Sequence, residues 1–288
     1  MKKIKTIIPA PPKGHWVGDG FPVHPVFAGM AFTREISPFL MLDYVQPEVF
    51  TPTLRQRGVG PHPHRGFETV TISYRGEIEH ADSVGNVGIV GPGDVQWMTA
   101  GSGIVHKEMH SSTFSRNGGT MEMVQLWVNL PAKYKMIAPR YQPILSRDIP
   151  IIKLTNDCAT VRVIAGKFKE IVGPASTFSP IDLWDIDLKS GGSMEFSVRN
   201  SDTTMLFVRK GRIVVGDVVV NAQEVALFAH EESIVRLDAQ EDVSALFMSG
   251  EPIHESIAAR GPFVMNFEEE IRQAMIDYQN GEMGQMAD

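Results

Sequence analysis

The chain is built from short runs rich in valine, isoleucine, threonine and phenylalanine, and glycine or proline interrupts most of them. The 26 glycines and 19 prolines are spread through all 288 residues. Short strand-like runs separated by turns are typical of an all-β sandwich or barrel. The runs that predict strands are Glu68–Tyr74, Val87–Val90, Met123–Leu130, Thr160–Ala165, Thr204–Val208, Arg212–Val220 and Glu224–Phe228.

The chain length favours two domains, since one domain usually takes about 100–200 residues. The segment Pro131–Pro150 contains four prolines and lacks clear alternation, so we interpret it as a connector between two β units. We therefore expect an N-terminal domain of residues 1–135 and a C-terminal domain of residues 136–288. A weak internal repeat supports two related units: Arg75–Ile78 (RGEI) resembles Lys210–Ile213 (KGRI), although an ordinary β-hairpin produces such a similarity about as often.

One short helix is expected near the C-terminus. Asn266 is a favourable N-cap, Glu269 follows three residues later, and the acidic run Glu268–Glu270 suits the positive end of a helix dipole. Asn280 and Gly281 supply a stop signal. The apolar face consists of Ile271, Ala274, Met275 and Tyr278. We interpret the segment as a packing helix that ties the C-terminal tail to a domain.

The composition argues against several classes of function. A formal net charge of −7 disfavours direct binding to nucleic acid, so any role in transcription would act through a protein partner. Cys158 is the only cysteine, which rules out an intrachain disulfide and fits the cytoplasm. We expect neither a secretory signal nor a membrane span, because Pro9, Pro11 and Pro12 interrupt the apolar start and no stretch approaches about 20 apolar residues.

The stretch Gly58–Glu108 contains two pairs of polar residues at strand spacing. Alternate side chains of an extended strand share a face, so His62 and His64 point the same way, as do His106 and Glu108. On facing strands inside a barrel, these pairs would bring three imidazoles and a carboxylate together. Nine histidines place one His-x-His pair in roughly a quarter of such chains by chance, but the second pair, which begins 42 residues later, favours a shared metal site.

Imidazole and carboxylate ligands without thiolate suit iron, manganese, nickel, copper or zinc, and the ligand set alone does not choose among them. Four protein ligands on an ion that prefers five or six leave positions open for water, dioxygen or a chelating substrate. We expect one divalent ion, with Fe(II) as the first choice, because histidine-rich sites with a carboxylate and open positions favour oxygen chemistry.

Other polar residues in this stretch have more than one interpretation. Glu68 is either a further ligand or a residue that hydrogen-bonds a ligand histidine. His80 is expected in a loop or behind the ligands rather than on the metal. Gln96, Trp97 and Met98 are candidates for a pocket wall, although residues such as Trp97 and Met98 are more often plain core. The remaining histidines have no partner at ligand spacing and are expected to be structural or solvated: His15, His24, His110, His230 and His254.

These motifs resemble those of the pirin family, within the cupin superfamily. The similar strings are HPHRGFETVTISYRG, HADSVGNVG, GDVQWMTAGSGIVHKEM and GPFVMNFEEEIRQA, and the resemblance covers nearly the whole chain. It implies a bicupin, that is, two cupin-type β-barrels packed together, with a metal in the N-terminal barrel and a C-terminal barrel without one. It carries the metal ligands onto His62, His64, His106 and Glu108, whereas many other cupins use a glutamate at the position of Glu68. The second half of the chain contains no His-x-His pair, which fits a barrel without a metal.

The family resemblance implies two classes of function. Some bacterial members resemble quercetin 2,3-dioxygenases, which open a flavonol ring with dioxygen and release carbon monoxide. Others act through protein partners, as nuclear transcription cofactors in animals or as modulators of a metabolic enzyme in bacteria. We expect a dioxygenase that acts on a small aromatic substrate such as quercetin, in which Glu108 or a nearby base takes the proton of the 3-hydroxyl. The alternatives are a metal-containing regulator that binds a protein partner, and a site with a structural role only.

Overall fold

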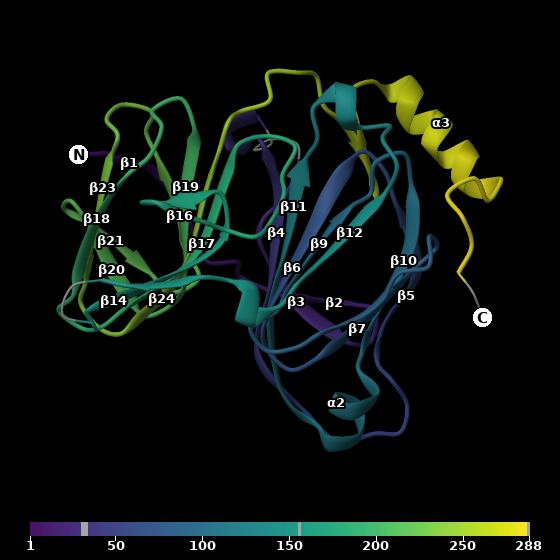
Figure 1. Ribbon diagram of the computed structural model, residues 1–288, viewed down its shortest axis with the longest axis horizontal. Coiled ribbons are helices and arrows are strands. Elements are labelled where there is room, and N and C mark those ends of the chain that lie inside the picture. The colour runs from purple at the N-terminus through teal and green to yellow at the C-terminus, as the bar shows by residue number, and fades with distance from the viewer. Residues whose placement is uncertain (30–33, 155–156, 287–288) are drawn as a thin grey trace. The chain divides into compact units, whose positions relative to one another are not determined.

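The structure is a computed structural model that describes residues 1–29, 34–154 and 157–286. Internal contacts divide the chain into two units, each built mainly of antiparallel strands (Figure 1). We name the first the histidine barrel; it comprises the described residues of Lys13–Thr33, Phe39–Ser146 and Ile253–Asp288. We name the second the apolar barrel; it comprises those of Met1–Pro12, Arg34–Pro38 and Arg147–Pro252.

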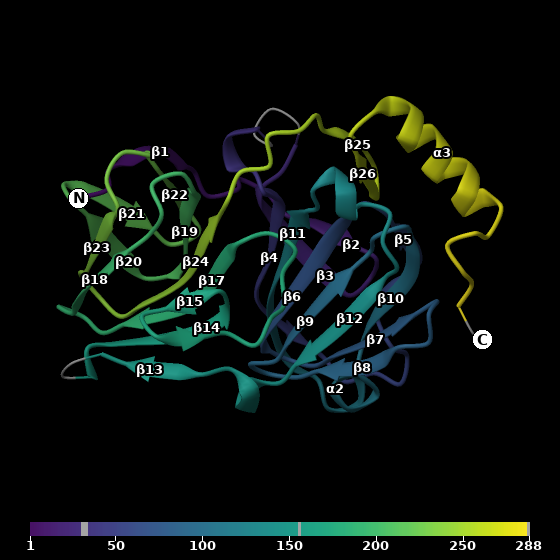
Figure 2. The same ribbon diagram turned by 45° about the horizontal axis from the view of Figure 1, so that its top comes forward.

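The histidine barrel is formed by two facing sheets. A seven-stranded sheet has the order β12-β9-β6-β11-β4-β3-β2, and a four-stranded sheet has the order β5-β10-β7-β8 (Figure 2). Its elements are β2 (His15–Val17), β3 (Phe21–Phe27), β4 (Phe39–Phe50), β5 (Gly58–His64), β6 (Phe67–Arg75), β7 (Ile78–Asp82), β8 (Val87–Val90), β9 (Val95–Thr99), β10 (Ile104–His110), α2 (Ser112–Asn117), β11 (Gly119–Asn129), η1 (Ala132–Tyr134), β12 (Arg140–Ile144), β25 (Ala258–Arg260), β26 (Phe263–Met265) and α3 (Glu268–Gln279).

The apolar barrel repeats this plan. Its seven-stranded sheet has the order β1-β22-β19-β24-β17-β14-β13, and its four-stranded sheet the order β18-β23-β20-β21. Its elements are β1 (Ile4–Ile8), β13 (Ile151–Lys153), β14 (Ala159–Ala165), β15 (Lys167–Phe168), β16 (Ile171–Val172), β17 (Ile181–Leu188), β18 (Ser193–Ser197), β19 (Thr203–Lys210), β20 (Arg212–Val215), β21 (Val218–Asn221), β22 (Val225–Phe228), β23 (Ile234–Ala239) and β24 (Val243–Gly250), and the short helix η2 (Ser146–Asp148) precedes β13. The predicted all-β fold of two related units is confirmed.

The weak sequence repeat marks equivalent turns of the two barrels. RGEI spans the turn from β6 to β7, and KGRI spans the turn from β19 to β20, which hold the same positions in the two sheet orders. Gly76 and Gly211 adopt φ angles of 82° and 81°. A left-handed backbone conformation of this kind favours glycine, so both barrels make this turn in the same way.

The observed division of the chain differs from the predicted one at residue 135 in three respects. Strand β1 pairs with β22 and completes a sheet of the apolar barrel. The segment interpreted as a connector contains β12, which pairs with β9 and completes a sheet of the histidine barrel. The C-terminal segment from Ile253 belongs to the histidine barrel. Strand pairing between distant segments sets these memberships, and local composition does not reveal it.

Helix α3 begins one residue later than predicted. Its N-cap is Phe267 rather than Asn266. Glu270, not Glu269, accepts hydrogen bonds from the backbone N–H groups of Asn266 and Phe267, each at 2.9 Å. The predicted stop is confirmed, because Asn280 is the C-cap and Gly281 has a φ of 78°.

The buried face of α3 is only partly as predicted. Ile271 and Ala274 are buried in an apolar cluster with β25 and β26, and Met275 packs against it. Tyr278 is 39% exposed, however, and Asp277 is buried in its place. The Asp277 carboxylate accepts a hydrogen bond of 2.6 Å from the Arg65 guanidinium, so an ion pair holds the last turn.

Most predicted strands are present, with one exception. The run Arg212–Val220 forms two strands, β20 and β21, because Gly216 turns the chain with a φ of 60°. Among the described residues, no helix is both long and apolar enough to cross a membrane.

Candidate metal centre

Three histidines of the histidine barrel converge from two paired strands. His62 lies opposite His106 in the antiparallel pair of β5 and β10, and His64 lies opposite Ile104. The ring centroids of His62 and His106 are 4.3 Å apart, and that of His64 is 4.9 Å from each of the other two. One ligand nitrogen from each of the three rings lies within 4.8 Å of the others. The sequence prediction that these histidines share a site is thus consistent with the geometry.

The position of β5 at a sheet edge explains the unusual run Gly-Pro-His-Pro-His. Pro61 and Pro63 have no N–H to donate, which a strand tolerates at the edge of a sheet. β5 has β10 as its only neighbour in the four-stranded sheet. The prolines alternate with the histidines, so His62 and His64 share the other face of the strand.

Several ring nitrogens of the three histidines have no hydrogen bond and could bind a cation. His62 Nδ1 is 2.9 Å from the carbonyl oxygen of Gly60, and His64 Nδ1 is 3.4 Å from that of Pro262. These contacts leave Nε2 of both rings available to a ligand. Neither ring nitrogen of His106 has a hydrogen-bond partner among the described residues, although the side chain is fully buried. Buried polar groups are normally satisfied, so the unpaired nitrogens fit a site built for a metal.

The electrostatics keep the buried imidazoles neutral. Burial, followed by the nearby His62, lowers the pKa of His64 to about 3, against a hydrogen bond to Pro262 that raises it. Burial also lowers the pKa of His106 well below its usual value, and the other histidines add to this shift. Neutral imidazole is the form that binds metal ions.

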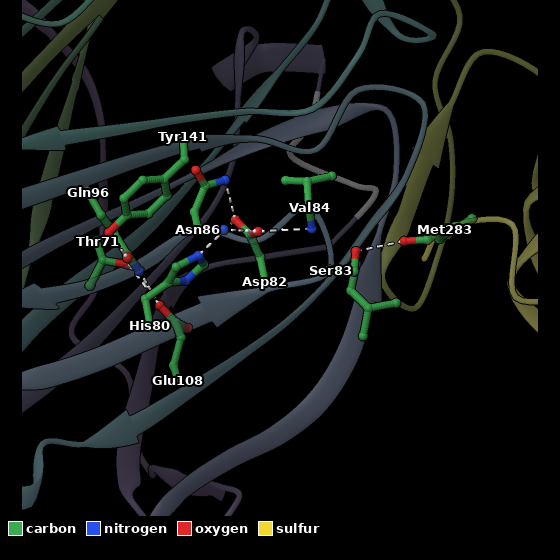
Figure 3. A network of polar contacts seen from close by, with 11 residues as sticks. Thr71, His80, Asp82, Ser83, Val84, Asn86, Gln96, Glu108, Tyr141 and Met283 are labelled. Carbon is green, nitrogen blue, oxygen red and sulfur yellow. Dashed lines mark hydrogen bonds and ion pairs between the residues drawn. The ribbon is translucent and has the colours of Figure 1, made fainter. Parts of the chain in front are cut away.

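Glu108 lies beside this cluster and is held by neighbouring polar groups. Its Oε1 accepts a very short hydrogen bond from the Gln96 amide and lies 3.2 Å from the Thr71 hydroxyl (Figure 3). The strand register shifts between His106 and Glu108, which indicates a bulge in the β5–β10 pair. Glu108 groups with His106 and His80 at ligand distances, rather than with all three clustered histidines. The structure therefore brings His62, His64 and His106 together and places Glu108 at the side of His106.

His80 lies on strand β7 and beside His106, not in a loop, which was one of its two predicted placements. It is fully buried on β7, its ring is stacked on Tyr141 at 4.6 Å, and its Nε2 is 3.1 Å from Asp82 Oδ2 (Figure 3). Its Nδ1 has no partner among the described residues. Burial opposes ionisation of Asp82, but hydrogen bonds from His80 and Asn86 lower the pKa of its carboxyl. The His80-x-Asp82 spacing on one strand face was the available signal.

Glu68, the alternative carboxylate, lies away from the cluster. Alternation along β6 puts Glu68 on the opposite face from Thr71, which points toward Glu108. Glu68 accepts a hydrogen bond of 2.7 Å from the Thr99 hydroxyl, and burial raises the pKa of its carboxyl to about 7. It belongs to no potential metal group among the described residues. The choice of Glu108 over Glu68 thus agrees with the direction of the side chains.

The remaining candidates are mostly structural, and none of the three residues predicted for a pocket wall lines the cavity beside the histidines. Trp97 and Met98 are fully buried core residues, and Gln96 fixes Glu108. His110 is structural, because its Nε2 is 2.8 Å from the Gly20 carbonyl oxygen and its ring packs against Phe50. Among the described residues, the other four histidines outside the centre join no potential metal group: His15, His24, His230 and His254.

A cavity of about 370 Å³ opens beside the cluster. Ligand-binding cavities usually fall between about 300 and 1,000 Å³ and are mostly apolar with a few polar groups, and this one fits both criteria. Its lining consists of Val17, Phe21, Val23, Met41, Asp43, Val59, His62, His64, Glu108, Met123, Gln125, Trp127 and Pro262.

Two barrels of one topology, with a histidine cluster inside one of them, define a two-domain cupin protein. The chain belongs to the pirin family, because the Pirin family model matches residues 20–128 and the model for the Pirin C-terminal cupin domain matches residues 183–284. A Pseudomonas aeruginosa protein provisionally named quercetin 2,3-dioxygenase is 51% identical over 281 residues, which cover 98% of each chain.

Solved structures agree with this assignment. The crystal structure of quercetin 2,3-dioxygenase from Acinetobacter baumannii matches with a TM-score of 0.96 and 46% identity, over 99% of both chains. A bacterial pirin from Escherichia coli, solved in complex with nickel(II), matches with a TM-score of 0.63 and 20% identity, over 86% of this chain and 98% of that one. The second likeness is one of fold.

Proposed function

We propose that the protein is a metal-dependent dioxygenase that cleaves the ring of a flavonol such as quercetin with dioxygen. The observation that carries this proposal is the His106 ring, which is fully buried with both nitrogens unpaired among the described residues, between two further histidines and beside an apolar cavity. The names of the two relatives at 51% and 46% identity support this substrate class.

We propose that one divalent metal ion is bound by His62, His64, His106 and Glu108. Three neutral imidazoles and a carboxylate suit Fe(II), our first choice, and also manganese, nickel, copper or zinc. When bound, the metal would supply positive charge that stabilises the substrate anion and would hold it close to dioxygen. The nickel(II) in the Escherichia coli structure shows that a relative of this fold takes a divalent ion.

The chain's own residues would bind the flavonol and accept its proton. Val59, Met123 and Trp127 line the apolar part of the cavity and would hold a planar aromatic ring away from water. Glu108 borders the same cavity and would accept the proton of the flavonol 3-hydroxyl. The hydrogen bond from the Gln96 amide orients its carboxylate for this role.

A turnover assay with quercetin tests the proposal. Protein loaded with Fe(II) should consume oxygen and quercetin in equal amounts and release carbon monoxide, and Glu108→Gln should lower kcat by about 100-fold or more, since a positioned base contributes about 10²–10⁴. Loaded protein that neither binds quercetin nor consumes oxygen would overturn the dioxygenase function. Stoichiometric capture of one protein partner, without turnover, would favour the regulatory alternative.

A further inference from the structure

One wall of the cavity carries a carboxylate, that of Asp43, which the proposed metal centre does not use. Five polar residues line the cavity: the three site residues His62, His64 and Glu108, and the pair Gln125 and Asp43. Asp43 lies on β4, directly opposite Gln125 on β11. The site described above gives Asp43 no role.

A row of polar side chains runs across the sheet from Glu108 toward Asp43. The Thr71 hydroxyl lies 3.2 Å from Glu108 Oε1 and 2.5 Å from Gln125 Oε1. Thr71 lies opposite Gln125, and Gln125 lies opposite Asp43, in the strand order β6-β11-β4. Two strand spacings separate Thr71 from Asp43 by about 10 Å. The cavity thus has the carboxylates of Glu108 and Asp43 at the two ends of this polar row, and apart from Gln125, His62 and His64 the rest of its lining is apolar.

The Asp43 carboxylate is a strong acceptor for which the described part of the chain supplies no donor. Among the described residues, no hydrogen bond or ion pair to this carboxylate is found. The side chain is half-buried, and burial, opposed by the charge of His15, raises the pKa of its carboxyl to about 6. A partly desolvated carboxylate gains more from a donor hydroxyl than a solvated one does. An aromatic ligand with a single hydroxyl at the metal end would leave this acceptor unpaired.

We propose that Asp43 selects polyhydroxylated aromatic substrates, by accepting a hydrogen bond from a hydroxyl group at the end of the substrate remote from the metal. This inference rests on the proposed function for the identity of the aromatic substrate. The apolar walls discriminate weakly between molecules of similar shape, whereas a site that hydrogen-bonds a hydroxyl rejects analogues that lack it much more strongly. Asp43 would therefore set specificity, while Glu108 acts on the reacting hydroxyl.

Two flavonols and two Asp43 variants test the proposal. Quercetin has hydroxyls on all of its rings, whereas 3-hydroxyflavone has only the one that reacts. Wild-type protein should prefer quercetin in kcat/KM. Asp43→Leu keeps the side-chain shape and removes the acceptor, so it should lower kcat/KM for quercetin by about 10–100-fold and leave that for 3-hydroxyflavone within about threefold. Asp43→Asn, which keeps a neutral acceptor, should give an intermediate value.

The control and the readouts separate this proposal from the proposed function. Glu48→Leu removes an exposed carboxylate from the same strand and should change neither substrate's rate. Equal losses for both flavonols in Asp43→Leu, or no loss, would overturn the role of Asp43 while the dioxygenase function stands. If wild type turns over neither flavonol, the proposed function fails. In that case, the binding of the same two compounds to wild type and Asp43→Leu is measured by the quenching of tryptophan fluorescence, and it decides the role of Asp43. Binding of neither compound overturns that role.

Discussion

The two barrels have the same strand order, but one encloses a cluster of histidines and the other an apolar core. In the histidine barrel, the first two strands of the four-stranded sheet, β5 and β10, carry His62 opposite His106. In the apolar barrel, the corresponding strands are β18 and β23, and they carry Met194 opposite Leu237. The fold therefore does not require the histidines, and one architecture accommodates either a polar cluster or a continuous apolar core.

The two interiors differ in whether their buried groups need hydrogen-bond partners. Met194, Phe196, Val235 and Leu237 belong to one buried apolar cluster and need no further partner. The buried nitrogens of His106 have no such compensation among the described residues. Leaving a buried polar group unpaired costs about 1–3 kcal/mol, so the histidine barrel is expected to depend on a ligand where the apolar barrel does not.

Removal of the clustered histidines should have the largest effect and would test the comparison directly. His62→Ala and His106→Ala should each lower metal affinity by at least about 100-fold, because residues behind the ligands alone are worth about 10–100-fold. His230→Ala, in the apolar barrel, should keep the wild-type metal content. Elemental analysis of purified protein measures this, and a metal retained by both cluster variants would show that the site lies elsewhere.

Substitutions at equivalent core positions of the two barrels should change the free energy of unfolding by different amounts when a chelator removes the metal. Leu237→Ala should lower the free energy of unfolding by about 2–5 kcal/mol, since it leaves a cavity in a packed core. His106→Leu should cost less than about 1 kcal/mol or stabilise, because it removes two unpaired buried nitrogens. Urea unfolding of the metal-free protein measures both changes. A large loss in His106→Leu without metal would mean that the imidazole supports the fold by itself.

A buried carboxyl should make the stability of the histidine barrel depend on pH, and this effect should be smaller than those of the substitutions above. Burial raises the pKa of Glu68 from 4.5 to about 7, so between these values the native state holds a proton that the unfolded state has lost. Stability should therefore fall as the pH rises through this window. Glu68→Gln should remove that slope and raise the free energy of unfolding at pH 8 by about 1–3 kcal/mol.

The control for this prediction comes from the apolar barrel. The Glu195 side chain is 48% exposed and pairs with Arg236, so Glu195→Gln should change stability by less than about 1 kcal/mol at any pH between 5 and 8. Urea midpoints measured across that pH range decide the matter. An unchanged pH slope in Glu68→Gln would show that other buried groups set it.

Local sequence patterns were sufficient to predict most strands, the related turns at Gly76 and Gly211, and the placement of His62 and His64 on one face of a strand. These features depend on side-chain alternation and backbone conformation, which neighbouring residues determine. The domain division was harder to predict, because β1 and β12 join their sheets through partners far away in the chain. The start of α3 was off by one residue, because the choice between Glu269 and Glu270 depends on how the chain enters the helix.

The sequence by itself determined the all-β class, the two related β units and the pairs His62 with His64 and His106 with Glu108, because period-two alternation and turn residues act over a few positions. The resemblance to a known family, rather than alternation, implied the two barrels and the choice of Glu108 over Glu68. Only the tertiary structure decided which strands face one another. That decision placed His80 beside His106, turned Glu68 to the other face of its sheet, and set Asp43 opposite Gln125 in the wall of the cavity that His62 and His64 also line. Register and sheet closure fix such neighbours through contacts between residues far apart in the chain, and no local pattern encodes them.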